Sequence, residues 1–258
     1  KSIDIFNNQV AHIIMQKIYS LLILAFIAIG LGSFVDNEPI EPVKKVKVPD
    51  FIKIDDPWVD SILSLLTLEQ KIAQLIMYPV YTKNGEAELM KIEKLVDDFG
   101  IGGLIYMQGG PVSQVNTHNR LMARSKVPLL TSIDGEWGVR MRLDSVIRFP
   151  RQMLLGAIQD ESLVYDMGVE IAKQCSLTGV HVNFAPVVDI NVNPNNPVIN
   201  SRSFGEVKEN VTRLSQAYMK GMQDNRVLAC AKHFPGHGDT DVDSHLGLPV
   251  IKHSAERI

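Results

Sequence analysis

Residues 227–245 concentrate the side chains of this sequence that can do acid–base or ligand chemistry. The segment opens with an apolar run, 227–231, which is typical of a strand buried on both faces. Pro235, Gly236 and Gly238 then interrupt regular structure. Seven charged or imidazole side chains follow the run: Lys232, His233, His237, Asp239, Asp241, Asp243 and His245. A buried strand that ends in a flexible, ionisable loop is how α/β enzymes present chemistry to a substrate, so we interpret this segment as the active-site edge of a barrel.

Length and composition limit the classes of protein to consider. The chain has 258 residues, enough for one α/β barrel or two small domains, and 45% of them are apolar, enough for a real core. A net charge of −3 and the lack of a long Lys/Arg cluster predict no nucleic-acid partner. The two cysteines, Cys175 and Cys230, are isolated in the sequence. We expect two buried free thiols, with a disulfide between them as the alternative.

The N-terminal part resembles an export signal. Residues 21–31 form an unbroken apolar run behind Lys17, and Met15 is a candidate start residue. The run has about the length of a secretory signal and is short for a spanning helix. We therefore predict that residues 1–35 are a signal peptide or an uncleaved N-terminal anchor, the only route to membrane contact. The Pro-, Glu- and Lys-rich residues 36–54 are a predicted linker, and the protein is expected to be exported, to the periplasm or cell envelope.

Strand and helix patterns alternate through the rest of the chain. Five strands are expected at 74–80, 102–107, 127–133, 180–188 and 227–231. Helices are expected at 58–66, from the N-cap Thr67 to about 73, and at 86–99, 112–125, 160–178 and 206–225. Such alternation requires parallel strands with helical crossovers, and no glycine-rich phosphate loop follows the first strand.

Polar and charged residues follow strands three, four and five, on what would be a single rim. This pattern favours a (β/α)₈ TIM-type barrel over residues 55–258. Because a closed barrel uses eight strands, we expect this chain to be truncated after about five of them.

Several residues on this rim have both a chemical and an ordinary interpretation. Asp243 can fix the tautomer of His245 two residues later and stabilise its protonated form, or both can close a polar surface loop. Lys232 can bind an oxygen ligand or extend its charge to solvent. Asp134 can accept two hydroxyl hydrogen bonds or cap a helix. The histidines and aspartates of 233–245 also suffice in number for a divalent ion, although their spacing matches no standard zinc pattern.

The sequence resembles glycoside hydrolase family 3 at several motifs in the family's order. They are KHFPGHG at 232–238 followed by Thr240 and DSH at 243–245, IDGEWGVRMRL at 133–143, FP at 149–150 with GA at 156–157, NFAPVVD at 183–189, and RSFG at 202–205. The match runs from about Leu66 to the end of the chain. Within the family it is similar to the bacterial β-N-acetylglucosaminidase branch rather than the β-glucosidase branch.

The resemblance implies a retaining β-N-acetylhexosaminidase that acts on cell-wall or chitin-like sugars. It assigns the proton donor to His245, with Asp243 beside it. The same resemblance implies a pocket for terminal N-acetylglucosamine, lined by Asp134, Arg142, Arg202, Lys232 and His233. The partner is then a carbohydrate substrate, and no cofactor is needed because an acid and a nucleophile suffice for this hydrolysis. The family's nucleophilic aspartate follows a later strand, so no residue of this chain is assigned that role.

The sequence departs from the family in the turn after the third strand. That turn often reads DQEGGRV, whereas here Gly135 replaces glutamine, Trp137 glycine and Val139 arginine. Trp137 can stack on a sugar face or pack on the rim. Two other functions remain as alternatives: a non-catalytic or degenerate sugar-binding homologue, and a metal-dependent hydrolase.

Overall fold

The computed structural model describes residues 55–251, 253 and 254. Its helices are α2 (Pro57–Leu65), α3 (Leu68–Ala73), α4 (Glu86–Phe99), α5 (Pro111–Arg124), α6 (Gln152–Leu155), α7 (Ser162–Leu177) and α8 (Lys208–Gln223). Its strands are β1 (Met77–Val80), β2 (Gly103–Tyr106), β3 (Leu130–Ile133), β4 (Val182–Asn183) and β5 (Leu228–Ala229). Three 3₁₀ turns, η2 (Thr82–Asn84), η3 (Val139–Met141) and η4 (Asn200–Arg202), lie in the connections. The predicted N-terminal signal and linker lie outside the described residues.

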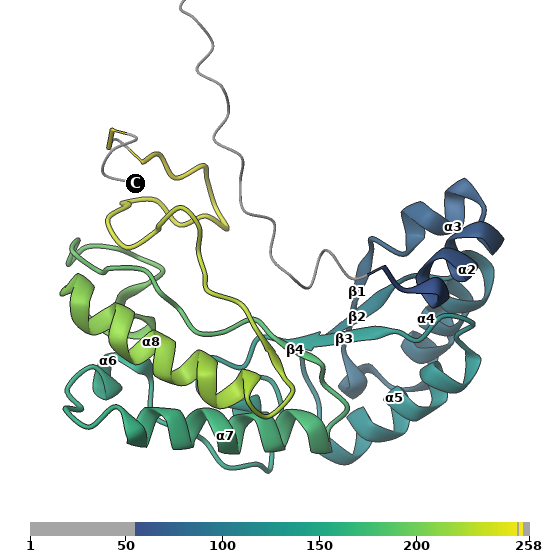
Figure 1. Cartoon of the computed structure of the whole chain (residues 1–258), viewed down its shortest axis with the longest axis horizontal. Helices are drawn as coiled ribbons and strands as arrows, with labels where there is room; N and C mark the ends of the chain where they lie inside the picture. Colours follow the sequence, from purple (N-terminus) through teal and green to yellow (C-terminus); the bar gives the residue numbers. More distant parts are fainter. Residues whose placement is uncertain (1–54, 252, 255–258) are drawn as a thin grey trace, which may run out of the picture. The chain divides into compact units, whose positions relative to one another are not determined.

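The five strands form one parallel sheet in sequential order, β1-β2-β3-β4-β5. Right-handed crossovers between parallel strands put every connecting helix on the same face when the strand order never reverses. Figure 1 shows α4, α5 and α7 along one side of the strands. This one-sided arrangement is that of a (β/α)-barrel, because a doubly wound sheet requires a reversal of strand order. The carboxyl ends of all five strands therefore share one edge.

The core lies between the sheet and these helices. Leu104 and Ile133 of the sheet are fully buried with Ile92, Leu121 and Leu214 of α4, α5 and α8. Such close-packed aliphatic contacts fix how the helices sit on the strands. They thereby fix where the loops at the carboxyl edge begin.

The structure confirms most of the expected elements and shortens the later strands. The capping box at Thr67 and Gln70 is present, and α4 has the predicted bounds. The first strand begins at Met77 rather than at Gln74, which caps the end of α3. The fourth is interrupted near Pro186, which has no N–H to donate to a ladder. Pairing resumes beyond it, where Val188 N donates to Lys232 O at 2.7 Å.

Two expectations about the fifth strand are wrong. Leu228 is 56% exposed, so the strand is not buried on both faces. The reason is its place in the sheet, since β5 pairs only with β4 within the described residues. Cys230 is half-buried rather than buried, whereas Cys175 is fully buried, and both thiols are free.

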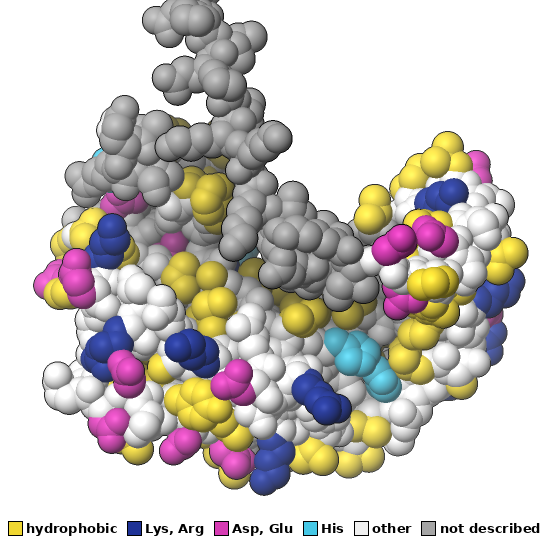
Figure 2. All heavy atoms as spheres, in the orientation of Figure 1, with side chains coloured by type: hydrophobic (Ala, Val, Ile, Leu, Met, Phe, Trp, Pro, Cys, Tyr) yellow, Lys and Arg dark blue, Asp and Glu magenta, His cyan; other side chains and the backbone are white. Residues whose placement is uncertain are grey.

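Two helices at the start of the described chain carry exposed apolar side chains. None of the residues of α2 is buried, and Leu65 of α2, Leu68 of α3 and Leu75, just after α3, are all more than two-thirds exposed. Figure 2 shows apolar side chains gathered over the part of the surface that α2 and α3 form. None of the helices within the described residues is long and apolar enough to cross a membrane.

Candidate active site

A connected network of charged side chains lies at the carboxyl edge of the sheet. Its members are Asp134, Glu136, Arg142, Asp189, Arg202, Lys232 and His233, which we call the rim cluster. Asp134 directly follows β3, and Lys232 lies where the chain after β5 pairs again with the chain after β4. All five residues that the sequence predicted as sugar-binding belong to this cluster.

Asp134 joins two cations of the cluster. Its Oδ2 accepts a hydrogen bond from Arg142 Nη2 at 2.6 Å, and its Oδ1 accepts one from Lys232 Nζ at 3.1 Å. Burial raises the pKa of Asp134, but Lys232 and Arg142 lower it by more, so the pKa of this carboxyl lies below its usual range. The carboxylate is thus held ionised with its lone pairs directed at fixed donors. A carboxylate of this kind can also accept hydrogen bonds from sugar hydroxyls.

Glu136 is the buried centre of the rim cluster and was not among the site residues predicted from the sequence. Its side chain is 1% exposed. Arg202 binds it through two parallel hydrogen bonds, Nε to Oε2 at 2.9 Å and Nη2 to Oε1 at 2.7 Å. Lys232 Nζ lies 3.0 Å from Oε1. Burial raises the pKa of Glu136, but the bond from Arg202 and the charge of Lys232 lower it by more, so the pKa is below its ordinary value.

Asp189 and His233 complete the network. Asp189 Oδ2 lies 2.7 Å from His233 Nδ1, and Arg202 Nη2 lies 3.3 Å from the other ring nitrogen of His233. Asp189 is fully buried, and it was not among the predicted site residues, since an aspartate is normally assumed to be exposed. The signal that could have found it is its position directly after an apolar strand pattern.

Buried amides hold the loops that carry these residues. Asn183 of β4 brackets the turn after β3: Gly135 N donates to Asn183 Oδ1 at 2.8 Å, and Asn183 Nδ2 donates to Gly135 O at 3.1 Å. A Cβ at position 135 would lie only 3.0 Å from that amide oxygen, which accounts for a glycine here. Asn196 Nδ2 donates to the carbonyls of His237 (2.6 Å) and Thr240 (3.0 Å), so the β4–α8 connection is fastened to the segment after β5.

Asp243 and His245 contact each other as predicted, but outside the rim cluster. Asp243 Oδ1 lies 2.7 Å from His245 Nδ1 and accepts the backbone N–H of His245 at 2.8 Å. These bonds, the backbone one first, lower the pKa of the Asp243 carboxyl. The His245 side chain is 77% exposed, and the hydrogen bonds and ion pairs found among the described residues do not join the pair to the rim cluster. The structure thus brings together two separate groups of predicted site residues.

The metal alternative has no support in the geometry. Within residues 55–251, 253 and 254, no three His, Cys, Asp or Glu side chains are grouped as metal ligands. The histidines and aspartates form separate pairs instead: Asp189 with His233, Asp243 with His245, and Asp239 with His253. A single pair offers too few ligands for a zinc site, which takes at least three from the protein.

The ring of Trp137 is in contact with the guanidinium group of Arg151. The guanidinium carbon of Arg151 lies 4.7 Å from the ring centroid, and Arg151 Nη1 donates to Ser201 Oγ at 2.8 Å. The side chain is therefore used in a cation–π contact on the rim. This contact favours the packing interpretation of Trp137 over a sugar platform.

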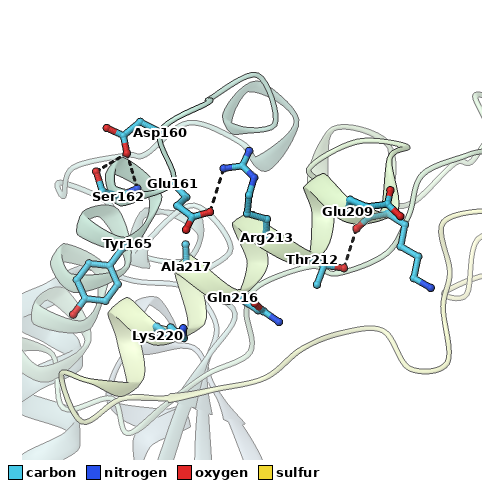
Figure 3. A pocket seen from close by; sticks show the side chains of 11 residues that line it. Asp160, Glu161, Ser162, Tyr165, Glu209, Thr212, Arg213, Gln216, Ala217 and Lys220 are labelled. Carbon is cyan, nitrogen blue, oxygen red and sulfur yellow. Dashed lines mark hydrogen bonds and ion pairs between the residues drawn. The ribbon is translucent and has the colours of Figure 1, made fainter.

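A hollow of about 650 Å³ lies apart from the rim cluster, along α7 and α8. Figure 3 shows its lining side chains, which share no residue with the cluster. Many of its polar groups are already used. Asp160 Oδ1 accepts the backbone N–H and the hydroxyl of Ser162 at the start of α7. Arg213 binds Glu161 and the carbonyl oxygens of Ile158 and Gln159. We therefore place the candidate active site at the rim cluster and not in this hollow.

Comparison with known proteins decides the family. Residues 67–258 match the profile of the glycosyl hydrolase family 3 N terminal domain. This chain belongs to glycoside hydrolase family 3. It is 38% identical over 181 residues to Beta-hexosaminidase A of Pseudoalteromonas piscicida, covering 65% of this chain and 30% of that protein.

Solved structures agree with that assignment. The family 3 β-N-acetylglucosaminidase of Paenibacillus sp. str. FPU-7 is 40% identical and superposes with a TM-score of 0.68, covering 74% of this chain and 38% of that one. The β-glucoside phosphorylase BglX is 30% identical with a TM-score of 0.68, covering 73% and 34%. The chain therefore spans only about a third of the length of these relatives.

Proposed function

We propose that the protein containing this chain is a retaining β-N-acetylhexosaminidase that removes terminal N-acetylglucosamine from cell-wall or chitin-like sugars. The observation that carries the proposal is the 2.7 Å contact between Asp243 and His245 in a chain of this family. An imidazole oriented by a carboxylate can donate a proton near neutral pH, which is what departure of the sugar's leaving oxygen requires. In this account His245 is the general acid/base, and Asp243 fixes its tautomer.

In the same proposal the rim cluster binds the sugar ring. Asp134, Arg142, Arg202, Lys232 and His233 supply both donors and acceptors on one edge of the sheet. Arg142 Nε is buried and has no hydrogen-bond partner within the described residues. A buried donor without a partner is costly, so a movement of the Arg142 side chain that brings this donor to a sugar oxygen would be favoured. The nucleophile is not assigned to any residue of this chain.

The domain boundaries of the chain and the cellular location of the protein are also proposals. Residues 55–258 would form the N-terminal part of the family barrel, behind a linker at 36–54 and a signal or anchor at 1–35. Export to the periplasm or cell envelope would follow from that signal. Fractionation of cells that express the full-length protein tests this, and recovery in the cytoplasm alone would contradict it.

The first test compares two aryl sugars with the full-length gene product. We expect release of nitrophenol from the nitrophenyl N-acetyl-β-D-glucosaminide and much slower release from the β-D-glucoside. Preference for the plain glucoside would contradict the proposed substrate class. Binding of N-acetylglucosamine without turnover of either compound would favour the non-catalytic alternative.

The assay should be run both with and without inorganic phosphate, because one similar structure is a β-glucoside phosphorylase. We expect the rate to be the same with and without phosphate and the product to be free N-acetylglucosamine. A phosphate-dependent rate with a sugar phosphate as product would replace hydrolysis by phosphorolysis in the proposal. The added arm thus separates two reactions that nitrophenol release alone does not distinguish.

A further inference from the structure

Asp189 is a buried carboxylate that binds the segment after β5 at three points. Oδ1 accepts the backbone N–H of His233 at 3.3 Å and that of His237 at 2.7 Å, and Oδ2 lies 2.7 Å from His233 Nδ1. Its side chain is fully inaccessible to solvent. A buried carboxylate is costly unless donors surround it. These three contacts therefore account for its stability in the fold and fix the start of the loop.

The partners of the His233 ring decide which nitrogen carries the proton. Arg202 Nη2 lies 3.3 Å from Nε2, and a guanidinium can only donate. Nε2 must therefore be an acceptor. Asp189 is an acceptor at the other nitrogen, so Nδ1 carries the hydrogen. Both neighbours select the same neutral tautomer, with its proton on Nδ1 and a bare Nε2 on the side of the rim cluster.

We propose that Asp189 is a positioning residue that holds the proton of His233 on Nδ1, so that the lone pair of Nε2, which here meets Arg202 Nη2 in a long contact of 3.3 Å, can pass to a hydroxyl donor of the substrate. The inference rests on the proposed function, in which His233 binds the sugar. A sugar hydroxyl that meets His233 must then donate its hydrogen. Fluorine at that carbon cannot donate, so its introduction should weaken binding as much as removal of the oxygen.

Substitution of Asp189 by asparagine separates this role from simple anchoring. The Asn Oδ1 atom can still accept the two backbone N–H groups, so the loop keeps the hydrogen bonds that hold its start in place. The Asn Nδ2 atom, a donor, would replace Oδ2 beside His233 Nδ1. The ring would have to move its proton to Nε2, where it would face the Arg202 donor. In Asp189→Asn, both neighbours of the His233 ring would therefore be hydrogen-bond donors, and a neutral imidazole can accept from only one of them.

The decisive measurement is nitrogen NMR of the full-length protein labelled at histidine nitrogens, with His233 assigned by its loss in His233→Gln. We expect a protonated Nδ1 and a bare Nε2 in the wild type, and loss of that pattern in Asp189→Asn. His181 is an internal reference: its Nδ1 contacts Thr131 and not Asp189, so its pattern should be the same in both proteins. A wild-type His233 with its proton on Nε2 would overturn the inference even if the variant failed to fold, and so would an unchanged pattern in a folded variant.

Kinetics provide a second readout. We expect kcat/KM of Asp189→Asn to fall by about 10- to 100-fold, the size of one charge-assisted hydrogen bond. Asp160→Asn, which alters another hydrogen-bonded carboxylate far along the chain at the start of α7, should leave kcat/KM unchanged. If the wild type cleaves no glycoside, the proposed function fails while the NMR pattern still decides the role of Asp189. If the wild type is active and Asp189→Asn matches it, only the positioning role fails.

Discussion

At the scale of single residues, the site depends on carboxylates that are buried among cations. Glu136 shows this most clearly, because Arg202 and Lys232 both direct their charges at one fully enclosed side chain. Removing one member of a buried ion pair leaves its partners uncompensated, which costs far more than losing an exposed pair. The stability of the rim cluster should therefore depend most on Glu136, the member that is buried between two cations.

Glu136→Gln should lower the free energy of unfolding by about 3–5 kcal/mol, because the isosteric amide removes the charge that Arg202 and Lys232 share. Lys232 keeps its ion pair with Asp134, but the half-buried Arg202 loses its carboxylate partner. Urea denaturation measures the change. Glu86→Gln is the matched control: it removes a carboxylate bound to Arg120 that is 62% exposed, and should cost about 0–1 kcal/mol. Equal losses in the two variants would contradict the central place of Glu136.

The sequence identified the ends of this network better than its centre. Asp134, Lys232 and His233 were predicted because each follows an apolar strand pattern or lies in a family motif. Glu136 and Asp189 were missed as organisers because burial of a carboxylate depends on donors from distant segments: Arg202 is 66 residues from Glu136, and His233 is 44 from Asp189. Local patterns carry no information about such pairings.

At the scale of elements, local signals predicted helices more accurately than strands. The capping box at Thr67 and the bounds of α4 depend only on neighbouring residues. Strand lengths depend on partners. The apolar pattern 180–188 continues through Pro186, but the ladder is interrupted there and β4 itself contains two residues. The long apolar pattern was correct about burial and wrong about regular pairing.

The contact between α7 and α8 requires glycine on both helices. A Cβ on Gly221 would lie 2.2 Å from Tyr165 O and 3.0 Å from the Cα of Gly168. In an exposed helix Gly→Ala is worth about 1 kcal/mol of added stability, but here the clash with backbone should reverse the sign. We expect Gly221→Ala to lower the free energy of unfolding by about 1–3 kcal/mol.

Thermal or urea denaturation tests the Gly221 prediction. Ser176→Ala, at an exposed position of α7, is the control and should change stability by less than about 0.5 kcal/mol. A Gly221→Ala protein as stable as the wild type, or more stable, would show that the two helices can separate without cost.

A pair of imidazoles joins α5 to the start of β4. The rings of His118 and His181 lie 6.2 Å apart, and His118 Nδ1 lies 3.3 Å from Tyr106 Oη. Burial lowers the pKa of both rings, and the charge of His181 lowers that of His118 further. The folded protein thus binds fewer protons here than the unfolded chain, whose histidines titrate near about 6.5.

Stability from these histidines should be fully present above about pH 6.5 and decline as the pH falls through that value towards the lower folded pKa. Urea midpoints measured between about pH 5 and 8 should therefore decrease on the acidic side, and His118→Gln should make the decrease shallower. Parallel curves for the variant and the wild type would contradict a depressed pKa at His118.

At the scale of the whole molecule, the order of the parallel strands matters most. The strand–helix alternation predicted parallel strands, and the charged residues after strands three to five predicted a barrel. The sequential strand order agrees with both, and the fold superposes on a family 3 relative. The sequence also placed the chemistry at the carboxyl edge, where the rim cluster lies. It did not predict that the Asp243–His245 pair lies apart from that cluster, because the path of the loop after β5 depends on contacts such as those of Asn196.

The central claim is that His245 gives its proton to the leaving group of a sugar bound at the rim cluster. A lost general acid costs most when the leaving group is poor, since a good one departs without protonation. The direct test is therefore kcat/KM of full-length His245→Ala on N-acetyl-β-D-glucosaminides with alkyl and with dinitrophenyl leaving groups. His253→Ala is the matched control, because His253 also pairs with an aspartate, Asp239, in the same segment.

We predict that His245→Ala loses about 10²- to 10⁴-fold on the alkyl glycoside and far less on the dinitrophenyl compound, while His253→Ala keeps wild-type rates on both. Equal losses on the two substrates, or none on either, would contradict the assignment of His245 as the acid.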